Sequence, residues 1–75
     1  MTEIAPGIVV DQGVHCGRAV IKGTRVPVDV ILGQLAAGLT PEAVADEYGV
    51  TREHVLAALG YAAKALSNEE IRATG

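Results

Sequence analysis

Large aromatic side chains are almost absent from this chain of 75 residues. It contains no phenylalanine and no tryptophan, and tyrosine occurs only at Tyr48 and Tyr61. Hydrophobic residues nevertheless make up 49% of the sequence, and nearly all of them are Ala, Val, Ile and Leu. A domain this short buries only about 60% of the surface that its unfolded chain exposes. We therefore expect a small core without large anchors, which a second copy completes in a homodimer.

Cysteine and long hydrophobic runs are scarce as well. Cys16 is the only cysteine and cannot form an internal disulfide, so the sequence does not indicate an oxidising compartment. No apolar run approaches the roughly 18 residues of a membrane helix. The first residues, MTEIAPG, lack the basic and apolar regions of a signal peptide. The sequence therefore predicts a cytoplasmic protein that does not enter the membrane.

The neighbours His15 and Cys16 are the one pair that suggests a metal site or a nucleophile. Zinc requires about four ligands at characteristic spacing, whereas this chain has one cysteine and two histidines, and the second histidine, His54, lies far along the sequence. Adjacent residues are also not the spatial Cys–His pair that catalysis uses, and no orienting carboxylate is evident. We expect no metal, no cofactor and no enzymatic activity, and the role of Cys16 stays open.

Positive charge is scarce too. Six Lys and Arg oppose nine Asp and Glu, which gives a net charge of −3 and an isoelectric point of about 5.1. This balance argues against non-specific binding to nucleic acid as the main activity. Half of the basic residues lie in one stretch, CGRAVIKGTRVPV, at residues 16–28.

This basic stretch has two interpretations. In the first, the backbone amides of Gly23 and Thr24 form an anion-binding nest with Arg25. In the second, the stretch is a turn in which Gly23 takes a positive φ and Thr24 bonds the local backbone. Four residues stay candidates for contact with an anion or a partner: Arg18, Lys22, Thr24 and Arg25.

The N-terminal third predicts a small sheet. Two short β-branched runs, at residues 8–10 and 19–21, predict an antiparallel pair of strands. Residues 25–28 are also expected to be extended, because Pro27 biases its preceding residue away from helix. So small a sheet is barely stable alone, and helices must cover it.

Two helices are predicted in the middle of the chain. The first spans residues 30–37, with Asp29 as its N-cap and Gly38 as its stop. The second begins at residues 40–41, where threonine as a cap and proline at the first helical position form the strongest helix start in the sequence. It is expected to end at Gly49.

A third helix is predicted after Thr51, its expected cap, with apolar residues at helical spacing: Val55, Leu56, Leu59 and Ala63. Residues 1–75 are expected to form one domain. It comprises a β-hairpin or extended region over 1–28, a helix-turn-helix core over 29–66 and a short C-terminal helix or tail over 67–75. The predicted fold class is mainly α with a small N-terminal β-hairpin: a helix-turn-helix domain of three to four helices, homeodomain-like or winged-helix-like.

The segment TPEAVADEYGVTREHVLAAL has the spacing of a helix-turn-helix, with a small residue, Ala45, four positions before Gly49. In a DNA-binding interpretation, the third helix enters a major groove and contacts bases or phosphates through Thr51, Arg52 and His54. In a structural interpretation, the two helices only pack a core or a dimer. Four carboxylates near the docking face would repel phosphates: Glu42, Asp46, Glu47 and Glu53.

The sequence from residue 16 to residue 63, CGRAVIKGTRVPVDVILGQLAAGLTPEAVADEYGVTREHVLAALGYAA, resembles the small bacterial family called domain of unknown function 433, and the likeness covers about residues 8–66. The motifs that carry it are GTRVPV at 23–28 and TPE at 40–42, in order and at the expected distance. Arg18-Ala19 stands where the family usually has Gly-Lys-Pro, and Ala43 replaces a second glutamate.

Members of this family look like antitoxins of the VapB type, often encoded beside a PIN-like ribonuclease toxin. The resemblance implies a homodimer that binds operator DNA through its helix-turn-helix and neutralises such a toxin. The alternative is a protein–protein interaction module or a structural dimer that binds no DNA. In that case the acidic helical face of Glu42, Asp46 and Glu47 covers a basic ribonuclease surface.

Overall fold

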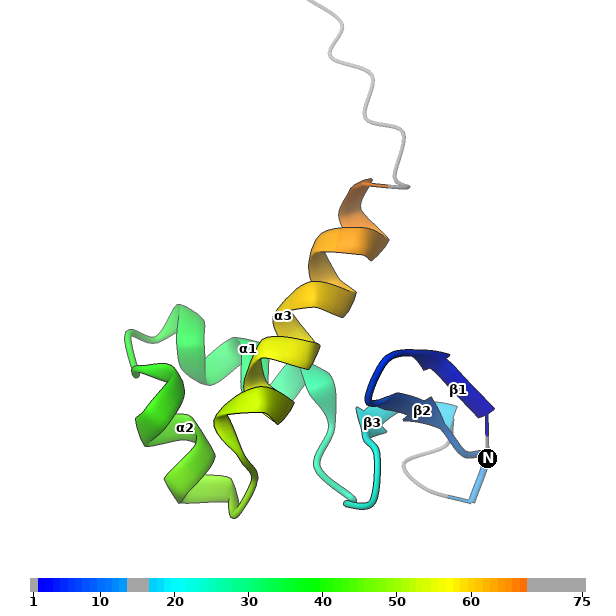
Figure 1. The fold of residues 1–75 in the computed structure, drawn as a ribbon, viewed down its shortest axis with the longest axis horizontal. Coiled ribbons are helices and arrows are strands. Elements are labelled where there is room, and N and C mark those ends of the chain that lie inside the picture. The colour runs from blue at the N-terminus through cyan, green and yellow to red at the C-terminus, as the bar shows by residue number, and fades with distance from the viewer. Residues whose placement is uncertain (1, 14–16, 68–75) are drawn as a thin grey trace, which may run out of the picture.

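The computed structural model describes residues 2–13 and 17–67. A small sheet forms the N-terminal part and helices form the rest (Figure 1). The elements in chain order are β1 (Thr2–Ala5), β2 (Ile8–Val10), β3 (Ala19–Ile21), α1 (Val28–Ala36), α2 (Pro41–Tyr48) and α3 (Arg52–Ser67). The predicted class, mainly helical with a small N-terminal sheet, is confirmed.

The sheet contains one strand more than the sequence indicated. β2 and β3 pair antiparallel as predicted, with Ile8 opposite Ile21. The additional strand, β1, pairs antiparallel with β2 at the edge of the sheet, and its register shifts between Glu3 and Ala5. Most of β1 is exposed, so it lacks the alternation of apolar and polar residues by which a half-buried strand is recognised.

Helix α1 begins earlier than predicted, and the assignment of Asp29 as its N-cap is wrong. The N-cap is Pro27, in an extended conformation and without a side-chain cap. Since proline already holds φ near the helical value, the helix starts directly behind it. Asp29 instead lies in the first turn, where the helix dipole favours a negative charge. Gly38 follows the helix with a φ of 104°, as expected of a stop.

Helix α2 begins and ends where the sequence predicts. The hydroxyl of Thr40 accepts the backbone N–H of Ala43 at 3.1 Å, and Pro41 is the first helical residue. Gly49 caps the C-terminus in the left-handed conformation, with φ 67° and ψ 30°. A helix that ends in this way turns the chain sharply, and α3 starts three residues later.

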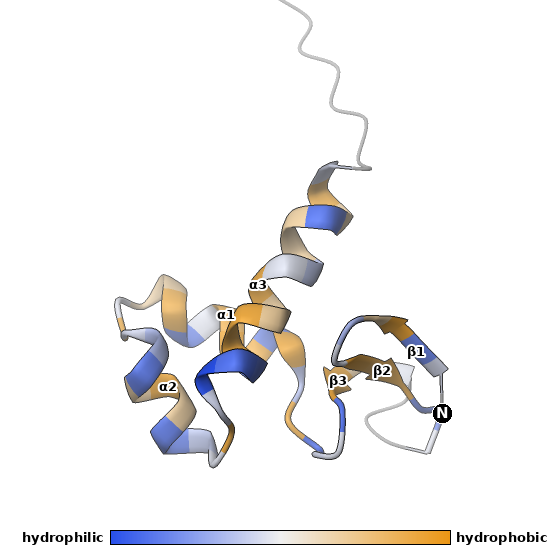
Figure 2. Cartoon of the chain, viewed as in Figure 1, coloured by the Kyte–Doolittle hydropathy of each residue, from blue (hydrophilic) through white to orange (hydrophobic). Residues whose placement is uncertain are grey.

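One hydrophobic core joins the sheet to all three helices, and its buried residues are Ile8, Ile21, Val28, Ile31, Val44, Ala45, Val55 and Ala58. β2, β3 and α1 are hydrophobic along most of their length, whereas α3 also carries hydrophilic residues (Figure 2). Leu56 and Leu59, two of the apolar residues at helical spacing in the predicted third helix, are nevertheless 42% and 39% exposed. Val55, which belongs to the same predicted set, and Ala58 are the buried residues of α3.

The C-terminal half of α3 extends beyond the rest of the domain (Figure 1). Its residues from 63 to 67 are all exposed, and Leu66 is 62% exposed. Within the part of the chain that the structure describes, no helix is long and apolar enough to cross a membrane. The exposure of residues 63–67 makes the end of α3 an exposed, partly apolar arm.

Candidate nucleic-acid interface

The turn between α2 and α3 positions the residues expected to bind DNA. The backbone N–H of Val50 donates to the carbonyl of Ala45 at 3.0 Å, which closes the turn behind Gly49. Ala45 of α2 is buried in the core, to which α3 also contributes. The first turn of α3 begins at once and is exposed at Thr51 and Arg52. The tight turn and the small buried residue are those that a helix-turn-helix requires.

Thr51 and His54 form the start of α3 together. The hydroxyl of Thr51 accepts the backbone N–H of His54 at 3.1 Å. In return, Nδ1 of His54 accepts the backbone N–H of Thr51, also at 3.1 Å. This is the arrangement of a capping box, with histidine in the position usually held by Glu or Gln. Both side chains therefore stabilise the first turn of the helix.

Arg52 forms an ion pair across the helix-turn-helix. Its Nε donates to Oε1 of Glu42, in the first turn of α2, at 2.9 Å, and both side chains are more than half exposed. The pKa of Glu42 lies below its ordinary value, because its own backbone N–H and then Arg52 stabilise the carboxylate. The cation at the tip of α3 is thus partly neutralised, but it remains accessible to solvent.

The outward face of α3 is apolar and has a groove beside it. The groove has a volume of about 410 Å³, and it is lined by Ala5, Pro6, Glu53, Leu56, Ala57, Gly60, Tyr61 and Lys64. The turn between β1 and β2 forms its other wall, since a Cβ built on Gly7 would lie 3.3 Å from the Cβ of Ala57. Such a surface differs from the basic, polar face that reads bases in a major groove.

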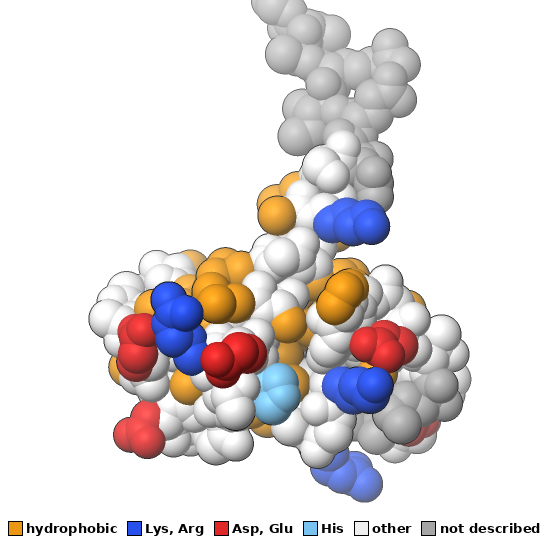
Figure 3. All heavy atoms as spheres, in the orientation of Figure 1, with side chains coloured by type: hydrophobic (Ala, Val, Ile, Leu, Met, Phe, Trp, Pro, Cys, Tyr) orange, Lys and Arg blue, Asp and Glu red, His pale blue; other side chains and the backbone are white. Residues whose placement is uncertain are grey.

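Sequence reasoning missed this groove because it grouped Leu56 with Val55 as apolar residues of one helix and did not separate the two faces. The signal was nevertheless present. Residues 53, 56, 57, 60, 61 and 64 recur at the i, i+3, i+4, i+7 spacing of one helical stripe. That stripe lies on the opposite side of α3 from Val55 and Ala58. The space-filling view shows apolar side chains at the surface, with acidic and basic ones beside them (Figure 3).

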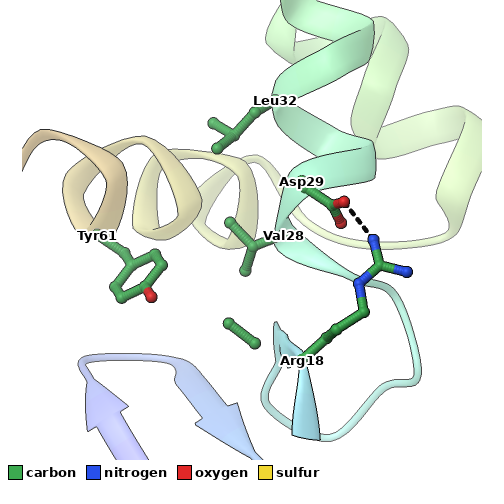
Figure 4. Close-up of a pocket in the computed structure, with 6 residues that line it drawn as sticks. Arg18, Val28, Asp29, Leu32 and Tyr61 are labelled. Carbon is green, nitrogen blue, oxygen red and sulfur yellow. Dashed lines mark hydrogen bonds and ion pairs between the residues drawn. The ribbon is translucent and has the colours of Figure 1, made fainter. Parts of the chain in front are cut away.

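The basic stretch forms a second group, around β3. Arg18 makes an ion pair with Asp29 in the first turn of α1 (Figure 4). This pair borders a pocket of about 310 Å³, whose far side is formed by Tyr61 of α3. Because the carboxylate of Asp29 already holds the guanidinium, Arg18 mainly joins the end of the sheet to α1.

Lys22 is engaged in a similar way on the sheet. Its Nζ lies 3.2 Å from Oε1 of Glu3 in β1, and the second oxygen of Glu3 accepts the backbone N–H of Gly7 at 3.0 Å. The Gly7 N–H first, and Lys22 second, hold the pKa of Glu3 below its ordinary value of 4.5. Glu3 therefore connects the exposed edge strand to the turn that follows β3.

The turn at residues 23–26 has the conformation that the structural interpretation predicts. Gly23 has a φ of 79°. The hydroxyl of Thr24 donates to the carbonyl of Ile21 at 2.8 Å and accepts the backbone N–H of Val26 at 3.0 Å. Arg25 follows in the same turn and is exposed. Thr24 thus satisfies the local backbone.

The predicted site residues therefore fall into two groups, one at the start of α3 and one around β3. His15 and Cys16 lie outside the described residues. Within the described ranges 2–13 and 17–67, no group of three or more His, Cys, Asp or Glu side chains could hold a metal ion.

The chain resembles known proteins over most of its length. Residues 8–62 match the model of a family described as protein of unknown function (DUF433). The crystal structure of Rv2018 from Mycobacterium tuberculosis is similar, with 44% sequence identity over 69% of this chain and a TM-score of 0.64. This chain spans only 24% of the length of that protein. No curated protein matches it.

Proposed function

The chain belongs to the DUF433 family, and from that premise we propose that it is an antitoxin-like protein that binds operator DNA through its helix-turn-helix and neutralises a PIN-like ribonuclease toxin. The observation that carries the proposal is the α2–Gly49–α3 unit. Its tight left-handed turn and its buried Ala45 support a helix-turn-helix that presents the exposed N-terminus of α3.

In this proposal DNA is approached by the tip of α3 and not by its side. Arg52 makes the phosphate contact, and the positive end of the helix dipole adds to it. Thr51 and His54 hold the first turn rigid through their mutual hydrogen bonds. Because few cations take part, the affinity should fall only shallowly with salt concentration.

The test is binding of the purified protein to a fluorescent duplex from the promoter of its own gene. Arg52→Ala should weaken binding by about tenfold, the value of one charged phosphate contact. Lys64→Ala, measured at submicromolar protein concentration, is the matched control, because it removes the same charge from the far end of the same helix. Equal affinity for Arg52→Ala and the wild type would refute the role of Arg52.

A second candidate, protein binding without DNA, is favoured by the acidic face of α2. Glu42, Asp46 and Glu47 are all exposed on this helix, and they complement a basic ribonuclease surface electrostatically. Charge reversal at Asp46 and Glu47 should abolish co-purification with a PIN-like ribonuclease encoded beside this gene. If that interaction is found and no promoter duplex binds, the second candidate replaces the first.

A further inference from the structure

The groove along the outward face of α3 is a surface for which the proposed function has no use. It lies between the turn that joins β1 to β2 and the stripe of α3 that begins at Glu53 and ends at Lys64. Leu56 in this stripe is 42% exposed, and Ile4 near the hairpin wall is 45% exposed. A domain with so small a core gains from covering apolar side chains of this size.

We propose that this groove binds the α3 helix of a second copy of the chain, antiparallel, about a two-fold axis that passes between residues 58 and 59. A two-fold axis requires a surface that is complementary to itself. The stripe meets that requirement at each position. Glu53 lies opposite Lys64 of the second copy, Leu56 opposite its Tyr61, and Ala57 opposite its Gly60.

The charges at the two ends of the stripe favour a second copy of the chain as the occupant of the groove. Glu53 and Lys64 lie at opposite ends of the stripe, 11 positions apart and thus about 16 Å along the helix. Neither residue has an ion-pair partner among the described salt bridges. In an antiparallel pair of helices, Glu53 of each copy meets Lys64 of the other. The two ion pairs fix both the direction and the register of the helices.

The centre of the stripe allows the two helices to approach closely. A Cβ built on Gly60 would meet nothing within 4 Å, so space is open directly above this glycine. Ala57, one turn earlier, carries only a methyl group and lies against the hairpin turn at Gly7, so Gly60 is the point of closest approach. Small residues at a crossing point let helix axes approach to about 8 Å. Leu56 of each copy then packs against Tyr61 of the other.

The interface is small, because it consists of one helix and the hairpin turn from each copy. Interfaces at the low end of the size range form transient complexes, and we expect a dissociation constant in the range of about 1–100 µM.

The dimer does not depend on the proposed DNA binding. It places the two Arg52 residues about 20 Å apart along the helix axes, which is less than the roughly 34 Å between successive major-groove sites. Dimer formation and symmetric docking of both α3 tips on one duplex therefore exclude each other.

The first experiment is sedimentation equilibrium of the whole chain, without DNA, from about 5 to about 500 µM. The wild type should dimerise. Glu53→Lys and Lys64→Glu should each raise the dissociation constant by about tenfold, because each places like charges opposite one another at both ends. The double variant E53K/K64E should restore the dissociation constant to within about threefold of the wild type.

The second experiment fills the space above the centre of the groove. Gly60→Gln should weaken the dimer by about tenfold or more, because the added side chain keeps the helices apart. Gly33→Gln is the matched control, since a Cβ on that exposed glycine of α1 also meets nothing within 4 Å. Both substitutions should preserve the helical circular dichroism, because glutamine favours helix over glycine.

A wild type that stays monomeric at the highest concentration overturns the proposal and leaves the groove to a different protein. If all three charge variants dimerise with the affinity of the wild type, the antiparallel register is wrong. A dimer that Gly33→Gln weakens as much as Gly60→Gln places the interface elsewhere. Failure of DNA binding affects none of these results, since no DNA is present.

Discussion

Thr51 and His54 hydrogen-bond each other twice at the start of α3, each side chain accepting the backbone N–H of the other at 3.1 Å. The same two residues are among the three that the sequence marks for contact with DNA. Their side chains already satisfy two N–H groups that would otherwise lack partners at the helix start. A substitution at either position therefore changes the stability of the helix as well as any contact with DNA.

Removal of this cap should destabilise the domain. Thr51→Ala is expected to lower the free energy of unfolding by about 1 kcal/mol, because the N–H of His54 loses its acceptor. Thr51→Ser should lose much less, since it keeps the hydroxyl. Urea denaturation monitored by circular dichroism measures both values. Equal stability of the alanine and serine variants would show that the hydrogen bond contributes nothing.

Release of Arg52 from Glu42 should strengthen DNA binding, if the tip of α3 binds DNA. Glu42→Gln removes the carboxylate that pairs with Arg52 at 2.9 Å, so the guanidinium is free to meet a phosphate. We expect an affinity increase of about threefold to tenfold in fluorescence anisotropy. Because the pair is exposed, the free energy of unfolding should change by less than about 1 kcal/mol.

Asp46→Asn is the control for this experiment. It removes one negative charge from the same exposed helix without releasing Arg52, so it separates the general charge effect from the specific one. Equal gains in affinity for Glu42→Gln and Asp46→Asn would show that Arg52 has no special role.

Substitution by alanine should change the free energy of unfolding in opposite directions at two exposed glycines. Gly49 has a φ of 67° at the turn between α2 and α3, a conformation that a side chain disfavours, so Gly49→Ala should destabilise by about 1 kcal/mol. Gly33 lies inside α1, where Gly33→Ala should stabilise by roughly 0.5–1 kcal/mol. Neither added Cβ meets an atom within 4 Å, and backbone conformation alone decides the sign. If the thermal unfolding midpoint of both variants lies below that of the wild type, this account of Gly33 is wrong.

Stability should depend on pH through Glu3. Its folded-state pKa is depressed below 4.5 by the Gly7 N–H and then by Lys22. The stabilisation is therefore fully present above pH 4.5 and is lost as the pH falls through the folded-state pKa. Glu3→Gln should show a smaller drop in urea midpoint between pH 7 and pH 3 than the wild type.

Lys22→Met distinguishes the two causes of this pKa shift. It removes the ammonium but keeps the Gly7 N–H, the larger cause. Its pH dependence should therefore lie between those of the wild type and Glu3→Gln. An identical drop in all three proteins would show that Glu3 does not contribute.

The turns and helix ends could be predicted because their causes are local. Proline at position 41, with its fixed φ, and glycine at positions 23, 38 and 49, with its access to positive φ, act within a few residues of themselves. For the same reason Thr24 could be predicted to bond its own turn. The error at Asp29 was also local, because Pro27 starts α1 without any side-chain cap.

The partners of the charged residues could not be predicted. Arg52 pairs with Glu42 ten residues away, Arg18 with Asp29 eleven away, and Lys22 with Glu3 nineteen away. Each pair joins two elements whose relative placement depends on the core. The edge strand β1 escaped prediction for a related reason, since its mostly exposed residues carry no pattern and its pairing with β2 defines it.

Backbone preferences and motifs of a few residues were enough to predict the antiparallel pair of β2 and β3, both ends of α2, the start of α3 and the resemblance to a family, because their causes act locally. Which face of α3 is buried depends on tertiary packing. Val55 and Ala58 belong to the core with residues of the sheet, α1 and α2, and Leu56 remains outside. Helical periodicity allows either face to be apolar, and the packing of distant elements selects one of them. The face that was not selected is the groove on which the proposed dimer depends.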